Sequence, residues 1–323
     1  VGIFGYGFML VMGAFYFLVP TLMKKKLFSE KLANINFILI VAGVLIVWSS
    51  SFFFRYAALY TNYWPLPVVR SKPIALLSYG IGMLSIMTSI LMFCFNLFAT
   101  ILKRDEGDKP ISSYIISGIG LDGLINLIRR MRGKPEKYSS PDVPLPIVAI
   151  FRGSIDTLLD AIVLGGISLI LVIYAISSFT GNMISHKIID PLIYKNVYWW
   201  GLDLIADGLV LIYVAGTWYL LTMIITGRRI FAENIARAAL FIELVVSWSV
   251  WSHHLLSDQP QPLLLKFISG ELITAFELVT TGIAIFCSLA TLWLARPLKM
   301  TIPLKFLLGG MAIQIRVFIL EIQ

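Results

Sequence analysis

PIALLSYGIGMLSIMTSILMFCFNLFATIL, residues 73–102, is the stretch that decides the fold, because it contains no Asp, Glu, Lys or Arg. A helix needs about 20 consecutive apolar residues to cross the hydrocarbon core of a bilayer. Residues 73–102 exceed that length. They therefore predict a transmembrane α-helix rather than a helix in the core of a soluble domain.

Stretches of similar character recur along the whole chain. Hydrophobic residues make up 58% of the 323 residues and charged residues only 14%, whereas a soluble domain has roughly 25% charged residues. We expect an all-α, polytopic transmembrane helical bundle with about eight membrane-spanning helices, forming a single transmembrane domain over residues 1–323. The predicted spans are residues 1–23, 32–59, 73–102, 147–179, 197–226, 230–253, 267–295 and 302–320.

Lys and Arg are distributed unevenly among the loops that connect these spans. Seventeen of them lie in or at the edges of the first, third, fifth and seventh loops, and five lie in the others. Because cytoplasmic loops carry the excess of Lys and Arg, the chain is predicted to start outside and to keep its basic loops in the cytoplasm. We expect a multi-pass protein of the cell membrane in contact with lipid. The net charge of +8 then needs no nucleic-acid partner.

The connection over residues 103–146 is the one long loop. Within it, residues 111–132 place apolar side chains at near-helical spacing and end in Arg129, Arg130 and Arg132. This pattern predicts a cytoplasmic basic loop with an amphipathic helix that lies on the anionic inner surface of the membrane. A regulatory role for the loop is the alternative.

Several acidic side chains fall inside the predicted spans. An ionisable group at bilayer depth costs about 3 kcal/mol or more, so each one suggests a proton path, an ion pair or a ligand site. Asp156 and Asp160 share one face of a helix, with Arg152 one turn earlier. Asp156 either pairs with Arg152 or belongs to a proton entry path. The candidate proton carriers are Asp156, Asp160, Asp207, Glu243 and Glu277.

Two polar segments are expected at the same depth in the outer part of the membrane. The span 197–226 enters from outside and the span 230–253 returns to the outside, which brings Asp203 and the pair His253–His254 to a similar level. Imidazole and carboxylate groups together suit copper, iron or zinc. We therefore name His253, His254 and Asp203 as candidate metal ligands. The alternative is that the two histidines mark an interfacial helix end and bond to loop carbonyls.

Five short segments, in the same order along the chain, resemble the large catalytic subunit of the haem-copper oxidases, the terminal oxidases of respiration, and its nitric oxide reductase relatives. The family segment DPLLYQHLFWFFG is similar to DPLIYKNVYWWG at residues 190–201, and the family segment VWAHH is similar to VWSHH at residues 250–254. The family segments GGFGNYLVP, YxxYPPL and a PTG-type turn followed by tryptophan resemble GAFYFLVP at residues 13–20, YTNYWPL at residues 60–66, and residues 280–282 followed by Trp293.

The resemblance implies a divergent catalytic subunit of a respiratory terminal oxidase. Such a subunit passes electrons from quinol or a small electron-carrier protein, through haem, to oxygen at a centre of haem and a non-haem metal. His253 and His254 would be two ligands of that metal, copper or non-haem iron, and other respiratory-complex subunits would be partners. The family's haem histidines would lie before Val1 and after Gln323. Since no starting methionine precedes Val1, we expect the chain to be part of a longer protein.

The chain also departs from the family pattern. The third metal histidine falls on Leu202, the tyrosine joined to it falls near Ala206, and the lysine of a proton channel falls on Ala284. Asp203, one position along, is the available oxygen ligand. A nitric oxide reductase-like subunit is one alternative, because its HLWVEG pattern resembles residues 203–208 with acids at both polar positions. A non-catalytic paralogue acting as structural subunit or ion path is the other.

Overall fold

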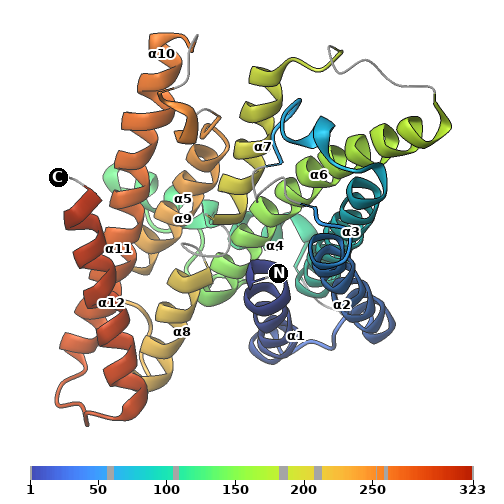
Figure 1. Cartoon of the computed structure of the whole chain (residues 1–323). Helices are drawn as coiled ribbons and strands as arrows, with labels where there is room; N and C mark the ends of the chain where they lie inside the picture. Colours follow the sequence, from blue (N-terminus) through green and yellow to red (C-terminus); the bar gives the residue numbers. More distant parts are fainter. Residues whose placement is uncertain are drawn as a thin grey trace. The chain divides into compact units, whose positions relative to one another are not determined.

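The computed structural model describes residues 2–56, 62–104, 109–181, 188–206, 213–251, 253–257 and 261–321. Within these ranges every regular element is a helix (Figure 1), which confirms the prediction of an all-α bundle. The chain divides into two compact units, and each is described by itself. The prediction of a single domain stays a prediction.

Unit 1 comprises residues 1–103, 155–205 and 250–266. Its helices are η1 (Ile3–Phe8), α1 (Met9–Met23), α2 (Glu30–Phe52), η2 (Val68–Arg70), α3 (Pro73–Leu102), α7 (Pro191–Ala206), η5 (His253–Leu255) and α10 (Leu263–Lys266). The long helix α6 (Leu145–Thr180) begins in unit 2 and continues in unit 1.

Unit 2 comprises residues 104–154, 206–249 and 267–323. Its remaining helices are α4 (Ile111–Gly118), α5 (Leu121–Met131), α8 (Tyr213–Thr226), α9 (Glu233–Ser247), η6 (Phe267–Leu272), α11 (Ile273–Leu294) and α12 (Ile302–Glu321). Helix α9 packs against α5 and α11, and α8 packs against α11 and α12.

Five helices of the described part of the chain are long and apolar enough to cross a membrane. They are Phe4–Met23, Glu30–Phe52, Pro73–Leu102, Leu145–Thr180 and Leu263–Leu294. The pair Ile111–Gly118 and Leu121–Met131 makes a sixth only if its bent halves form one span. The protein is therefore built from membrane-type helices, and the number of about eight spans stays a prediction.

Helices α2 and α3 lie side by side in unit 1 (Figure 1), and buried polar side chains fix their register. The Nδ2 of Asn36 donates to the backbone oxygen of Ser89 at 2.6 Å, and the Ser89 hydroxyl donates back to the Asn36 carbonyl at 2.9 Å. Further along, Asn96 donates to the carbonyl of Ser29 at 2.9 Å and accepts from its N–H at 3.1 Å. Because unpaired polar groups are costly inside a membrane, these reciprocal bonds specify one pairing of the two helices.

The amphipathic helix predicted over residues 111–132 is two helices, α4 and α5, which meet at an angle of 81°. The chain breaks at Gly120, whose φ of +79° is the left-handed conformation that glycine adopts without strain. An added Cβ at Gly120 would lie 2.3 Å from the carbonyl oxygen of Arg237, so the position also requires a residue without a side chain. The break lets α5 pack along α9. Its predicted place on the cytoplasmic membrane surface stays a prediction.

Candidate functional site

Helix α7 carries the first half of the predicted metal site. Asp190 starts the helix because its Oδ1 accepts from the backbone N–H groups of Leu192 and Ile193, both at 2.9 Å. Asp203 lies three residues before the end of α7 and is 7% exposed. Asp207, the neighbouring candidate proton carrier, lies outside the described residues.

The segment with the two histidines lies beside α7 within unit 1. The ring centroids of Trp200 in α7 and Trp251 are 6.3 Å apart. Further along, the Nε2 of Gln261 donates to the Oδ1 of Asn196 at 3.2 Å. These contacts bring together the two segments that the sequence placed at one depth.

The histidines themselves do not continue the preceding helix, as the span 230–253 had predicted. Helix α9 ends at Ser247, and His253 begins a separate short 3₁₀ helix, His253–Leu255. His253 is partly buried, whereas the side chain of His254 lies outside the described residues. The interfacial alternative for the two histidines stays open.

Among the described side chains, no group of three His, Cys, Asp or Glu residues is close enough to hold a metal ion. Metal centres of the type implied by the resemblance need at least three protein ligands around a copper or zinc ion. The described residues alone therefore do not complete the ligand set, and the role of the three candidate ligands stays a prediction.

A cavity of about 600 Å³ lies in unit 1, among α2, α3, α6 and α7. Tyr198 and Leu202, one turn apart on α7, both line it. Leu202 is the position of the third metal histidine in the resemblance. That face of α7 therefore presents an apolar side chain to an uncharged cavity, since none of the described lining residues is charged.

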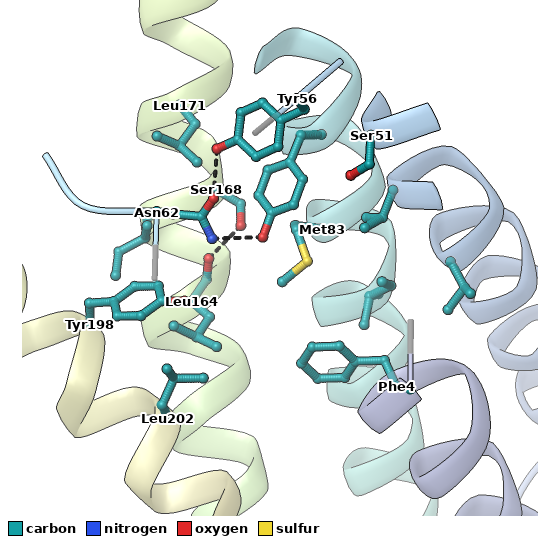
Figure 2. A pocket seen from close by; sticks show the side chains of 16 residues that line it. Phe4, Ser51, Tyr56, Asn62, Met83, Leu164, Ser168, Leu171, Tyr198 and Leu202 are labelled. Carbon is teal, nitrogen blue, oxygen red and sulfur yellow. Dashed lines mark hydrogen bonds between the residues drawn. The ribbon is translucent and has the colours of Figure 1, made fainter. Parts of the chain in front are cut away.

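One end of this cavity is polar but neutral (Figure 2). The Tyr56 hydroxyl donates to the Oδ1 of Asn62 at 2.6 Å, and the Nδ2 of Asn62 donates to the Tyr79 hydroxyl at 2.8 Å. The Tyr194 hydroxyl also fixes the position of Asn62 by donating to its backbone carbonyl at 2.9 Å. The cavity thus suits a small neutral molecule, because it offers hydroxyl groups and aromatic faces without a charge.

The candidate proton carriers in the described helices differ in their surroundings. Asp156 and Asp160 in α6 are both 0% exposed, and Glu243 in α9 is 1% exposed. Neither carboxylate oxygen of Asp160 or of Glu243 has a hydrogen-bond partner among the described residues. Glu277 in α11 is only partly buried.

Arg152 takes part in a buried contact within unit 2. It is 0% exposed, and its Nη2 donates to the Ser247 hydroxyl of α9 at 2.9 Å. The guanidinium of Arg152 therefore ties the start of α6 to the end of α9. The alternative roles of Asp156 stay predictions.

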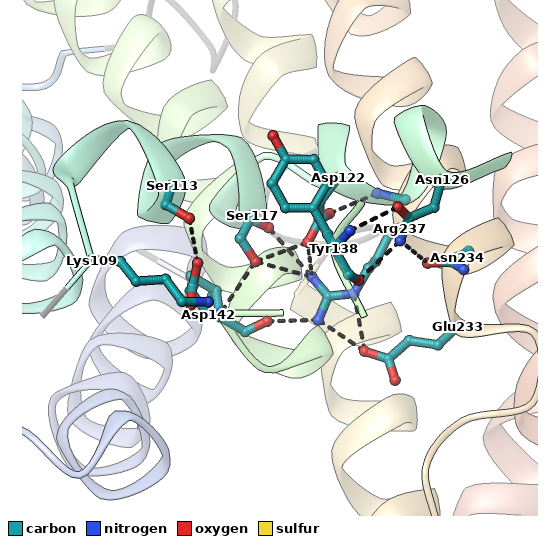
Figure 3. Close-up of polar contacts among 12 residues, drawn as sticks. Lys109, Ser113, Ser117, Asp122, Asn126, Tyr138, Asp142, Glu233, Asn234 and Arg237 are labelled. Carbon is teal, nitrogen blue, oxygen red and sulfur yellow. Dashed lines mark hydrogen bonds and ion pairs between the residues drawn. The ribbon is translucent and has the colours of Figure 1, made fainter. Parts of the chain in front are cut away.

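Sequence reasoning missed Arg237 of α9, a buried and extensively bonded charge (Figure 3). Its side chain is 1% exposed, and its Nη1 lies 3.1 Å from Asp122 Oδ2. Its Nη2 lies 2.8 Å from Glu233 Oε1 and donates to the Val143 carbonyl at 2.6 Å. The signal that could have found it is the position of an arginine inside the predicted span 230–253.

This cluster joins α5 and the segment before α6 to α9. Asp122 accepts a further bond from the Ser117 hydroxyl at 2.9 Å, and the same hydroxyl accepts from the N–H of Val143 at 3.1 Å. Every group near the guanidinium is thus part of one network. Its position suits a structural clamp, because its acceptors come from three separate segments of the chain, α5, α9 and the segment before α6.

Comparison with protein families gives one match that covers almost the whole chain. The family described as cytochrome c and quinol oxidase polypeptide I matches residues 1–316. The chain belongs to this family. Membership of the oxidase polypeptide I family confirms the resemblance to subunit I of the haem-copper oxidases and supports an oxidoreductase of the terminal-oxidase type in a membrane complex. A comparison with curated proteins gave no match.

Proposed function

We propose that this chain is the catalytic subunit of a divergent respiratory terminal oxidase, which takes electrons from quinol or a small electron-carrier protein and delivers them through haem to oxygen. The family match over residues 1–316 supports the reaction class. The proposed location of the metal site rests on the contact between Trp200 and Trp251, because this contact joins α7 to the segment with the two histidines.

His253, His254 and Asp203 would hold the non-haem metal, copper or iron. When bound, that metal would supply a Lewis-acid and redox centre that holds and polarises oxygen beside the haem. No residue of this chain is assigned to haem. Other respiratory-complex subunits are the expected partners in the membrane.

The chain's own acids would supply protons to the reaction. Asp160 and Glu243 are the best placed to store them, since their buried carboxyl groups have no hydrogen-bond partner among the described residues. Carboxyl groups inside a membrane protein are typical carriers in proton relays. Asp156, Asp207 and Glu277 remain the further candidates for this path.

Replacing His253 with alanine is expected to remove most of the non-haem metal while the helices stay folded. An imidazole is lost from the ligand set, but His253 is only partly buried, so its truncation leaves the packing of unit 1 intact. Elemental analysis of the purified complex measures the metal, and circular dichroism measures the helix content. Unchanged metal in the folded variant would remove His253 from the site.

Asp203 and Asp207 form a matched pair for the oxygen ligand. Asp203→Asn is expected to lower metal occupancy more than Asp207→Asn, because Asp203 is buried on the helix that contacts the histidine segment. Both substitutions remove one charge from nearly the same position in the chain. Equal metal content in the two variants would refute a ligand role for Asp203.

The position of Leu202 specifically favours a second candidate, a paralogue that has kept the fold without the metal. Its apolar side chain lines a neutral cavity at the position of the third metal histidine. Metal analysis of the purified complex separates the two, since only the oxidase would hold the non-haem metal. The buried Asp203 favours a nitric oxide reductase-like subunit, which turnover of nitric oxide instead of oxygen would identify.

A further inference from the structure

A second cavity lies in unit 2, between α11 and α12. It encloses about 530 Å³ and is lined mainly by apolar side chains, with Leu289 and Leu292 from α11 and Leu304 and Leu308 from α12. Both helices fall on predicted membrane spans. A cavity of this size accommodates a small ligand or part of a lipid chain.

Basic side chains gather where this cavity reaches the connection between the two helices. Arg296 lines the cavity, and its guanidinium carbon lies 3.6 Å from the ring centroid of Trp293. This cation–π contact orients the guanidinium against the aromatic ring. The side chain of Arg296 makes no hydrogen bond or ion pair with any residue that the structure describes. Its N–H groups therefore remain available to an anion.

A second loop brings another cation to the same place. The Nη1 of Arg228 donates to the carbonyl of Leu294 at 2.8 Å, which places the loop after α8 beside the end of α11. Residues 227–232 and 295–305 contain no Asp or Glu, but they hold four further basic residues besides Arg228. The end of the cavity that Arg296 lines therefore lies next to two loops that carry basic residues and no acid. The four residues are Arg229, Arg296, Lys299 and Lys305.

We propose that this cavity binds one acyl chain of an anionic phospholipid whose phosphate is held by Arg296, together with Arg228 and Lys299. The apolar walls match a hydrocarbon chain, and guanidinium groups bind phosphate oxygens through charge-assisted hydrogen bonds. The two loops belong to the set predicted to face the cytoplasm, where the membrane surface carries anionic lipids. The site lies in unit 2 and does not depend on the proposed metal site.

The combination of apolar walls and neighbouring basic residues argues against two simpler occupants, a zwitterionic lipid and a free phosphate. A zwitterionic lipid such as phosphatidylcholine also has a phosphate, but its choline ammonium would add another cation beside these basic residues. A free phosphate would leave the apolar cavity unfilled. An anionic phospholipid satisfies both parts at once, because its headgroup and tail meet at the depth where membrane helices leave the hydrocarbon core.

Native mass spectrometry of the purified complex, mixed with phosphatidylglycerol or phosphatidylcholine, tests the proposal. Arg296→Gln is expected to lower retention of phosphatidylglycerol about fivefold, the ratio expected for one basic residue at an anionic surface, and to leave phosphatidylcholine unchanged. Arg132→Gln is the matched control, since it removes an exposed cation outside the cavity. It is expected to lower retention of phosphatidylglycerol less than Arg296→Gln does, because an exposed surface cation adds only diffuse attraction, and to leave phosphatidylcholine unchanged.

Two further measurements separate the headgroup from the tail. Leu308→Trp narrows the cavity and is expected to reduce retention of both lipids, whereas inorganic phosphate alone is expected not to displace phosphatidylglycerol. Equal loss of phosphatidylglycerol in Arg296→Gln and Arg132→Gln would show diffuse attraction and overturn the site. Displacement by inorganic phosphate, or absence of any retained lipid in the intact complex, would overturn it as well.

Discussion

Replacement of Arg237 with methionine is expected to lower the free energy of unfolding by about 3–5 kcal/mol, the usual cost of removing one partner from a buried ion pair. The guanidinium is 1% exposed and lies 3.1 Å from Asp122, which is itself 1% exposed. Methionine fills a similar volume but removes the positive charge that pairs with this carboxylate and the N–H group that donates to the Val143 carbonyl. Denaturant unfolding in detergent micelles, followed by tryptophan fluorescence, measures the change.

Three other variants test whether the loss of the buried ion pair causes this decrease in stability. Arg130→Met removes an exposed arginine and is expected to change stability by no more than about 0.5 kcal/mol. Arg237→Lys is expected to be intermediate, because an ammonium group cannot reproduce the planar set of guanidinium bonds. The double variant Arg237→Met with Asp122→Asn is expected to recover part of the loss, since no buried charge is left unpaired. If Arg237→Met alone is no less stable than Arg130→Met, Arg237 does not act as a structural clamp.

The membrane-type helices could be predicted from the sequence, because whether a segment can cross the bilayer depends mainly on its own length and apolar composition. Residues 73–102 were predicted as a span, and α3 has the same limits, Pro73–Leu102. The break at Gly120 could not be predicted in this way. Its neighbours continue the apolar spacing, and only the contact with the Arg237 carbonyl in another helix shows why the chain turns there.

The candidate site was predictable to the level of segments. Alternating span directions placed the Asp203 turn and the histidine pair at one depth, and Trp200 and Trp251 do lie in contact. Which face of α7 meets which neighbour depends on packing between distant segments, so Leu202 could not be assigned to a cavity from its spacing. The same holds for Arg237 and Asp122, which are 115 positions apart in the chain.

Gly82→Ala is expected to lower the free energy of unfolding by about 1–3 kcal/mol, although alanine is the better helix former. A Cβ at Gly82 would lie 2.9 Å from the backbone nitrogen of Val47 and 3.0 Å from the carbonyl oxygen of Gly43. Since both atoms belong to the backbone of α2, relief requires α2 and α3 to move apart. Small residues that allow such close approach are a general means of packing helices in membranes.

Gly166→Ala adds the same methyl group to a glycine of α6 whose Cβ would meet nothing within 4 Å. It is expected to be neutral or to stabilise the protein by up to about 1 kcal/mol, because alanine restricts the unfolded chain and favours the helix. The two variants therefore differ in sign only because of the neighbouring helix. Equal effects in micelle unfolding would mean that α2 and α3 are not held at the observed distance. If only Gly82→Ala lowers the stability, the same separation of α2 and α3 is expected to disturb the 600 Å³ cavity. Val47 and Met83 line this cavity from those two helices.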